Sequence, residues 1–348
     1  MWKESTGECF LSLSKGNNHK QEGHMRPVSV EHHGNFAQEL AIAGRQFYGG
    51  RALVGDCVAI VLPYEPDPHH IDFLRAYGLG PDIIRVGDVY ADAMRGATAD
   101  LIRRHGIQLF WVGTEEAEVL RELGIRLPIS PAMMQAINCK GVFRKIGAAM
   151  GVQGHMPLHA LCRTHAEARD AWQRLSHVEA DGHPIPDAII VKRRDLLSGA
   201  GMHIVRTREE LDRAVKDMNG HEYIVEAAYT THVSASAHWD ATNRGLIRAG
   251  VTLQLISHGV THEGNVIAFG EAMLPGVSRD DEEMMYGLGE PFVRFWHAKR
   301  RYRGMFGIDI IRVLGLDRRT RSYAIEPNAF RPPAPRYAMA LWRQIASR

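Results

Sequence analysis

The sequence has few cysteines, no long apolar run and almost no net charge. Its four cysteines are scattered among 348 residues. This excludes a disulfide framework or a paired-cysteine zinc site, and predicts reduced thiols in a cytoplasmic protein. No apolar stretch approaches the about 20 residues that cross a bilayer, so we expect no membrane partner. Residues 1–26 lack the apolar core of a signal peptide, and we expect them to form a flexible tail.

Charge of one sign is also missing. Lysine and arginine total 42 against 40 aspartate and glutamate residues, which gives a formal charge of +2. A protein that neutralises a nucleic-acid backbone needs a large positive excess, so we expect no nucleic-acid partner. Any phosphate that this chain binds should be bound by a local group of residues.

Two familiar motifs are absent. Nineteen histidines are present, but no H-E-x-x-H occurs, and the adjacent pairs His32-His33 and His69-His70 cannot face one ion from a regular element. No G-x-G-x-x-G follows a predicted strand either. The glycines at 49, 50 and 55 are more typical of a turn. We therefore expect neither a histidine metal site nor a dinucleotide.

The length of 348 residues favours two or three domains. In the first part, short apolar runs alternate with helical periods, which predicts a doubly wound α/β domain over residues 27–135. The expected strands are 59–63, 82–89 and 107–113, and the expected helices are 73–80, 91–106 and 115–124.

From residue 136 the pattern changes to strands joined by loops and hairpins. We expect a helix over 137–152 and another that Thr164 caps. The other expected elements are strands within 187–207, a helix over 208–218, and strands over 221–229, 265–274, 304–315 and 323–328.

Two lysines and a glycine-containing loop are the first candidates for phosphate binding. Lys140 lies near the start of a predicted helix, and Lys192 ends an apolar strand that a loop with Ser198, Gly199 and Gly201 follows. Glycines let backbone N–H groups approach phosphate oxygens, and lysine supplies compact positive charge. A lysine that simply ends a strand before a hairpin is an equally good interpretation.

An acidic residue interrupts the apolar strand Tyr-Ile-Val-Glu-Ala-Ala-Tyr at Glu226. If adenine lay along this strand, the backbone could pair with the ring edge and the carboxylate could accept from the exocyclic amine. A buried carboxylate needs such a partner. The alternative is a solvent-facing Glu226 on an edge strand.

The most specific feature is a possible metal site near the end of the chain. Glu326 and Asn328 alternate along one strand, so both point to one face of a sheet. If that strand pairs with Phe-Gly-Ile-Asp-Ile-Ile-Arg-Val, Asp309 can join them. Carboxylate and amide oxygens are ligands that Mg²⁺ prefers. An ordinary hairpin with outward polar residues is the alternative.

Taken in this order, these features resemble the ATP-grasp superfamily of carboxylate ligases. The resemblance implies a preATP-grasp domain over 27–135, followed by a two-lobed α+β ATP-grasp fold over 136–348 with its lid at about 155–225. It implies phosphate contacts from Lys140 and Lys192 and a phosphate loop at 198–201. It further implies adenine contacts from Glu226, Ala227 and Tyr229, ribose contacts from His232, metal ligands at Asp309, Glu326 and Asn328, and catalytic roles for Lys192 and Arg331.

The implied activity is an ATP- and Mg²⁺-dependent carboxylate–amine ligase that acts on small molecules through an acyl phosphate. A carboxylase or thiol ligase of the same fold, or an ATP-binding protein without catalysis, is the alternative, and a homodimer is left open. Candidate contacts for the substrate are Arg279, Arg312, Arg331, Arg336, His258 and His262.

Overall fold

The computed structural model describes the chain in two parts. In the first part it covers residues 28–30, 59–62, 68–76, 83–86 and 107–109, and a few single positions between 100 and 124. In the second part it covers residues 129–329 without 177–182, 195–200, 219, 258–260, 269–273 and 301. No helix in these ranges is long and apolar enough to cross a membrane.

The first part contains a parallel sheet. Strands β1 (Val28–Val30), β2 (Ala59–Leu62), β3 (Ile83–Val86) and β4 (Ile107–Leu109) lie in the order β3-β2-β1-β4. Every pairing is parallel. Three of the four strands fall in the ranges that the sequence predicts, and parallel pairing is typical of a doubly wound domain. The assignment to a preATP-grasp domain stays a prediction.

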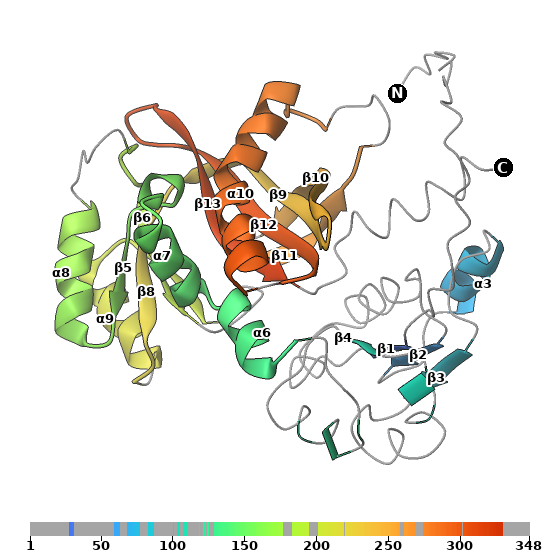
Figure 1. Cartoon of the computed structure of the whole chain (residues 1–348). Helices are drawn as coiled ribbons and strands as arrows, with labels where there is room; N and C mark the ends of the chain where they lie inside the picture. Colours follow the sequence, from blue (N-terminus) through green and yellow to red (C-terminus); the bar gives the residue numbers. More distant parts are fainter. Residues whose placement is uncertain are drawn as a thin grey trace.

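The second part begins with a sheet that we call the small sheet. It contains β5 (His159–Cys162), β6 (Ala188–Arg193), β7 (Met202–Val205) and β8 (Tyr223–Ala228), antiparallel in the order β5-β8-β6-β7. Helices α8 (His165–Ser176) and α9 (Arg208–Asp217) pack on one face of it (Figure 1). Thr164 caps α8 as expected, because its hydroxyl accepts from the backbone N–H of Glu167.

The large sheet follows. It contains β9 (Thr230–Thr242), β10 (Gly245–Ser257), β11 (Thr261–Val266), β12 (Gly304–Leu314) and β13 (Thr320–Ala329), in the order β11-β10-β9-β12-β13. All its pairings are antiparallel. The sequence predicts β12 and β13 well. The strand expected over 265–274 overlaps β11 only at its end, because β11 ends at Val266, and residues 269–273 lie outside the described residues.

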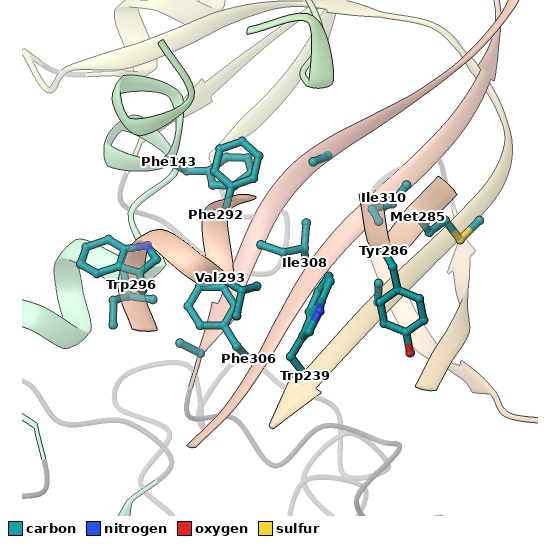
Figure 2. Close-up of a cluster of buried hydrophobic side chains, with 14 of the residues drawn as sticks. Phe143, Trp239, Met285, Tyr286, Phe292, Val293, Trp296, Phe306, Ile308 and Ile310 are labelled. Atoms are coloured by element: carbon teal, nitrogen blue, oxygen red, sulfur yellow. The ribbon is translucent and has the colours of Figure 1, made fainter. Parts of the chain in front are cut away.

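Helix α10 (Arg279–Arg300) covers one face of the large sheet and forms the main core with it. Figure 2 shows Phe292 and Val293 of this helix among Trp239, Phe306 and Ile308 of the sheet. All five side chains are buried. Since side chains alternate along a strand, packing of Ile308 and Ile310 against this helix leaves Gly307 and Asp309 on the opposite face of the sheet.

A glycine of α10 allows the helix to pack closely against the large sheet, and substitution of this glycine tests that contact. A Cβ at Gly289 would lie 2.5 Å from Trp239 Cη2 and 3.2 Å from the side chain of Ile308, whereas a Cβ at Gly287 would meet nothing within 4 Å. Alanine normally stabilises a helix interior by up to about 1 kcal/mol relative to glycine. We expect Gly287→Ala to show this gain. Gly289→Ala should instead lower the free energy of unfolding in urea by about 1–3 kcal/mol, because overpacking outweighs propensity.

Helices α6 (Pro131–Asn138) and α7 (Lys140–Ala149) replace the single helix expected over 137–152. The break lies at Cys139, whose backbone is extended. The Asn138 side chain explains the break, because its Oδ1 accepts from the backbone N–H of Ala329 at 2.9 Å. This bond joins the helix end to β13, and it makes Lys140 the first residue of a new helix.

Candidate active site

The hairpin of β12 and β13 has the arrangement that the sequence predicts. Asp309 lies directly opposite Glu326, and Gly307 lies opposite Asn328. A bulge after this pair leaves Ile325 without a direct partner, so the strands twist past it. The three polar side chains therefore share the face of the large sheet that α10 leaves open, and both carboxylates are partly buried.

The environment of these two carboxylates fits a divalent cation. Burial and the nearby Glu326 raise the pKa of Asp309 to about 6, although side-chain hydrogen bonds with Ser236, Gln254 and Asn328 oppose this. A cation between the carboxylates would remove their repulsion, and the donors are the hard oxygens that suit Mg²⁺. Within the described ranges no group of three or more His, Cys, Asp and Glu side chains could hold a metal. The predicted site has two carboxylates, and its third donor is the side-chain amide of Asn328.

Lys140 connects this hairpin to α7. Its Nζ lies 3.0 Å from Glu326 Oε2, and the side chain is only 3% exposed. Its backbone N–H donates to the carbonyl of Arg194 at 2.9 Å. Arg194 directly precedes residues 195–200, so the start of α7 lies at the base of the predicted phosphate loop.

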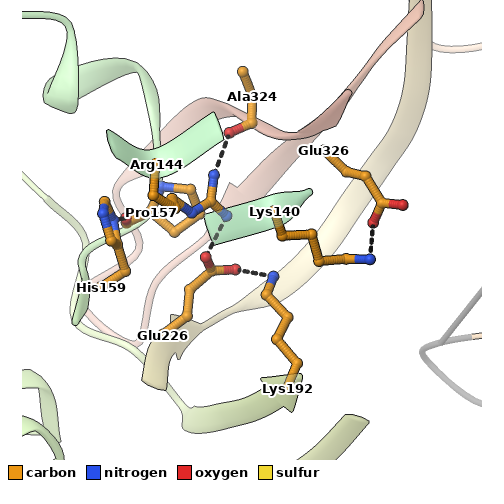
Figure 3. Close-up of polar contacts among 8 residues, drawn as sticks. All are labelled: Lys140, Arg144, Pro157, His159, Lys192, Glu226, Ala324 and Glu326. Atoms are coloured by element: carbon orange, nitrogen blue, oxygen red, sulfur yellow. Dashed lines mark hydrogen bonds and ion pairs between the residues drawn. The ribbon is translucent and has the colours of Figure 1, made fainter. Parts of the chain in front are cut away.

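Lys192 belongs to a cluster of charged side chains where α7 meets both sheets, and it shares a carboxylate with an arginine (Figure 3). We call this cluster, which consists of Lys140, Arg144, Lys192, Glu226 and Glu326, the junction. Its Nζ donates to Glu226 Oε1 at 2.7 Å, and Arg144 donates to Glu226 Oε2. Burial alone would raise the pKa of Glu226, but Arg144 and Lys192 outweigh it and lower that pKa to about 2. Burial lowers the pKa of Lys192 in spite of this partner, with Arg144 and Lys140 acting in the same direction.

The predicted adenine contacts lie along the strand end that joins the two sheets. Glu226 and Ala227 are buried in β8, Tyr229 follows it, and His232 is exposed on β9. Ala227 and Tyr229 form an apolar cluster with Val313 and Tyr323 of the large sheet. The cations described above occupy both carboxylate oxygens of Glu226, while the role of its neighbours toward adenine stays a prediction.

Several predicted residues cannot be placed in this site. Ser198, Gly199, His258, Arg331 and Arg336 lie outside the described residues, as does the side chain of His262. Gly201 is described and has φ of 62°, a left-handed conformation that favours glycine. Of the proposed substrate contacts, Arg312 forms an ion pair with Asp281 of α10, and Arg279 begins that helix.

Three polar residues of the site are not predicted from the sequence: Arg144, Ser236 and Gln254. Arg144 could have been found, because it lies four residues after Lys140 and thus on the same helix face. Ser236 lies beside Asp309 in the register of β9 and β12. The period-two alternation in residues 230–242 could have revealed that strand, with its polar side chains on one face.

Comparisons with known proteins agree with this architecture. The sequence matches no protein-family model and no curated protein. A solved N5-carboxyaminoimidazole ribonucleotide synthetase in complex with ADP is 14% identical with a TM-score of 0.56, over 89% of this chain and 71% of that chain. The Staphylococcus aureus synthetase in complex with ADP is 12% identical with a TM-score of 0.57, also over 89% of this chain and 71% of that chain.

The Aspergillus clavatus synthase, solved with ADP and 5-aminoimidazole ribonucleotide, is 13% identical with a TM-score of 0.52, over 88% of this chain and 70% of that chain. All three similar proteins are named as N5-carboxyaminoimidazole synthetases or synthases. The similarity covers most of the chain. The chain therefore shares the overall fold of these proteins, in agreement with the fold expected from the ATP-grasp resemblance of its sequence.

Proposed function

We propose that this chain is an ATP- and Mg²⁺-dependent carboxylate–amine ligase. It forms an amide or peptide bond between small molecules, with amino acids or short peptides as the substrate class, and it releases ADP and phosphate. The observation that carries the proposal is the junction of the two sheets. There the buried Lys140 pairs with Glu326, which lies opposite Asp309, and the buried Lys192 pairs with Glu226.

The chemistry follows from the charges at this junction. A carboxylate becomes an acyl donor only after it accepts the γ-phosphoryl group of ATP, and charge then spreads over phosphate oxygens. Lys140 and Lys192 would hold those oxygens in a buried setting, where the attraction between opposite charges is stronger than in water. Asp309, Glu326 and Asn328 would hold Mg²⁺, which neutralises phosphate charge when bound. Arg331 would steady the transferred group.

A carboxylase is a second candidate. The structural neighbours described above are named N5-carboxyaminoimidazole ribonucleotide synthetases, and one of them was solved with ADP and 5-aminoimidazole ribonucleotide. Bicarbonate would then take the place of the organic carboxylate as the acyl donor. The thiol ligase and the ATP-binding protein without turnover remain further alternatives.

One assay separates these functions. The purified chain is incubated with ATP, Mg²⁺ and a panel of amino acids, each alone and in pairs. Parallel mixtures contain bicarbonate with an amine, or a carboxylate with a thiol, and the release of ADP and phosphate is measured in each. We expect release that requires both a carboxylate and an amine. Release with bicarbonate and an amine alone supports the carboxylase, and release that requires a thiol supports the thiol ligase. Nucleotide binding with no release in any mixture contradicts ligase activity.

A further inference from the structure

Arg144 is a fully buried cation at the centre of the junction. The residue is 1% exposed, and an arginine does not lose its proton inside a protein. A buried guanidinium therefore needs a permanent partner. Arg144 has two: it donates to Glu226 Oε2 and, at 3.4 Å, to the carbonyl of Ala324.

Those partners belong to different parts of the fold. Arg144 lies on α7, Glu226 on the small sheet and Ala324 on the large sheet (Figure 3). Lys140, one helical turn earlier, pairs with Glu326 of the large sheet. Helix α7 thus fixes the two sheets against each other through two cations on one of its faces.

Two of the three cations share one carboxylate. Arg144 and Lys192 both contact Glu226, whereas Lys140 contacts Glu326, which lies opposite Asp309. A lysine ammonium on a flexible stem can turn from one acceptor to another, whereas the planar fork of arginine is fixed by its geometry. When a nucleotide phosphate attracts Lys192, Glu226 keeps a counter-ion only if Arg144 stays in place.

We propose that Arg144 is a positioning residue, the permanent counter-ion of Glu226 that leaves Lys192 free to bind a nucleotide phosphate. This inference rests on the proposed function, because it assumes a nucleotide at the junction. Without Arg144, Lys192 is the remaining cation that contacts the Glu226 carboxylate. That carboxylate then competes directly with the phosphate for the ammonium group of Lys192.

The test compares two ligands that differ only in their phosphates. The affinities of ADP with Mg²⁺ and of adenosine are measured by calorimetry for the wild type and for Arg144→Met. We expect Arg144→Met to weaken ADP binding by on the order of tenfold to a hundredfold, with adenosine affinity unchanged. Lys145→Met is the matched control, since its side chain is 54% exposed on the same helix, and it should behave as the wild type.

Removal of the competing carboxylate provides the second arm. In Arg144→Met/Glu226→Gln the lysine loses its charged competitor, so the ratio of ADP affinity to adenosine affinity should return toward the wild-type ratio. Because the ratio is the readout, any contact between residue 226 and adenine cancels. If Arg144→Met does not fold, the neutral and polar Arg144→Gln replaces it in both arms, with thermal unfolding as the check on folding.

Two results would overturn the inference. The first is an unchanged ratio in the single variant, either because neither affinity changes or because both fall equally, as a purely structural role gives. The second is a double variant with as low a ratio as the single one. A wild type that does not prefer ADP to adenosine contradicts the proposed function itself, which makes the two failures distinguishable.

Discussion

Asp309→Asn is expected to lower the rate of ADP formation by about a hundredfold or more, the size typical of losing a group that stabilises phosphoryl charge. The substitution removes one of the two carboxylates of the predicted metal site. The enhancement of ADP affinity by Mg²⁺ should fall with it, and calorimetry with and without Mg²⁺ measures this without turnover.

The same variant should fold at least as stably as the wild type. Burial and Glu326 raise the pKa of Asp309 to about 6, above the value of about 3.9 in an unfolded chain, so the ionised carboxylate lowers the stability of the fold at neutral pH. A neutral asparagine removes that repulsion. We expect an equal or higher free energy of unfolding at pH 7 together with the loss of activity, a combination typical of functional sites.

Asp317→Asn is the control for this experiment. Asp317 lies in the turn between β12 and β13, where its carboxylate accepts from the backbone N–H of Arg319 at 3.1 Å. Both variants replace an aspartate by an asparagine in the same hairpin, but Asp317 lies at the turn, away from the predicted metal site along both strands. If Asp317→Asn loses as much activity as Asp309→Asn, or if Asp309→Asn keeps its Mg²⁺ dependence, the metal assignment is wrong.

Glu226→Gln is expected to have the largest effect on stability. It leaves Arg144 and Lys192 buried without a charged partner, and removing one member of a buried ion pair costs about 3–5 kcal/mol. The lowered pKa of Lys192 favours the lower end of this range, because that lysine can release its proton. Urea unfolding measures the cost.

The control is Glu222→Gln, where the arginine partners are more exposed. The side chains of Arg194 and Arg163 there are 37% and 71% exposed, so each pair contributes about 0–1 kcal/mol. A cost for Glu226→Gln no larger than for Glu222→Gln would contradict a tightly held ion cluster.

The effect of Glu226→Gln should also depend on pH. Glutamate in an unfolded chain has a pKa of about 4.3, and that of folded Glu226 is about 2. Because the folded pKa is lower, the ionised Glu226 stabilises the fold fully above about pH 4.3 and loses this contribution as the pH falls toward 2. The difference in unfolding free energy between wild type and variant should therefore shrink below about pH 4.3. A constant difference would contradict the assigned charges.

How far the sequence alone predicts this molecule differs between elements. The hairpin with Asp309 and Glu326 could be predicted, because an apolar strand with few polar positions leaves little choice of face. Helix α10 could not, since Gly287, Gly289 and Pro291 within it are normally helix breakers. Tertiary packing stabilises this helix in spite of its glycines, since Gly289 allows the helix to approach Trp239 closely.

The site shows the same division. Lys140, Lys192 and Glu226 stood out because charged residues interrupt apolar patterns. Their ion pairs could not be predicted, because the partners lie far apart in the sequence. Arg144 and Glu226, for example, are separated by 82 positions. The break at Cys139, which makes Lys140 the first residue of α7, depends on a bond from Asn138 to β13 that no local pattern encodes.

A crystal structure with a non-hydrolysable ATP analogue and Mg²⁺ tests the account most directly. We predict the analogue at the junction of the small and large sheets, with its phosphates contacted by Lys140 and Lys192 and the cation held by Asp309, Glu326 and Asn328. Lys192 should then have turned from Glu226 to a phosphate, while Arg144 remains on Glu226. A nucleotide bound elsewhere, or a cation held by other residues, would contradict the account.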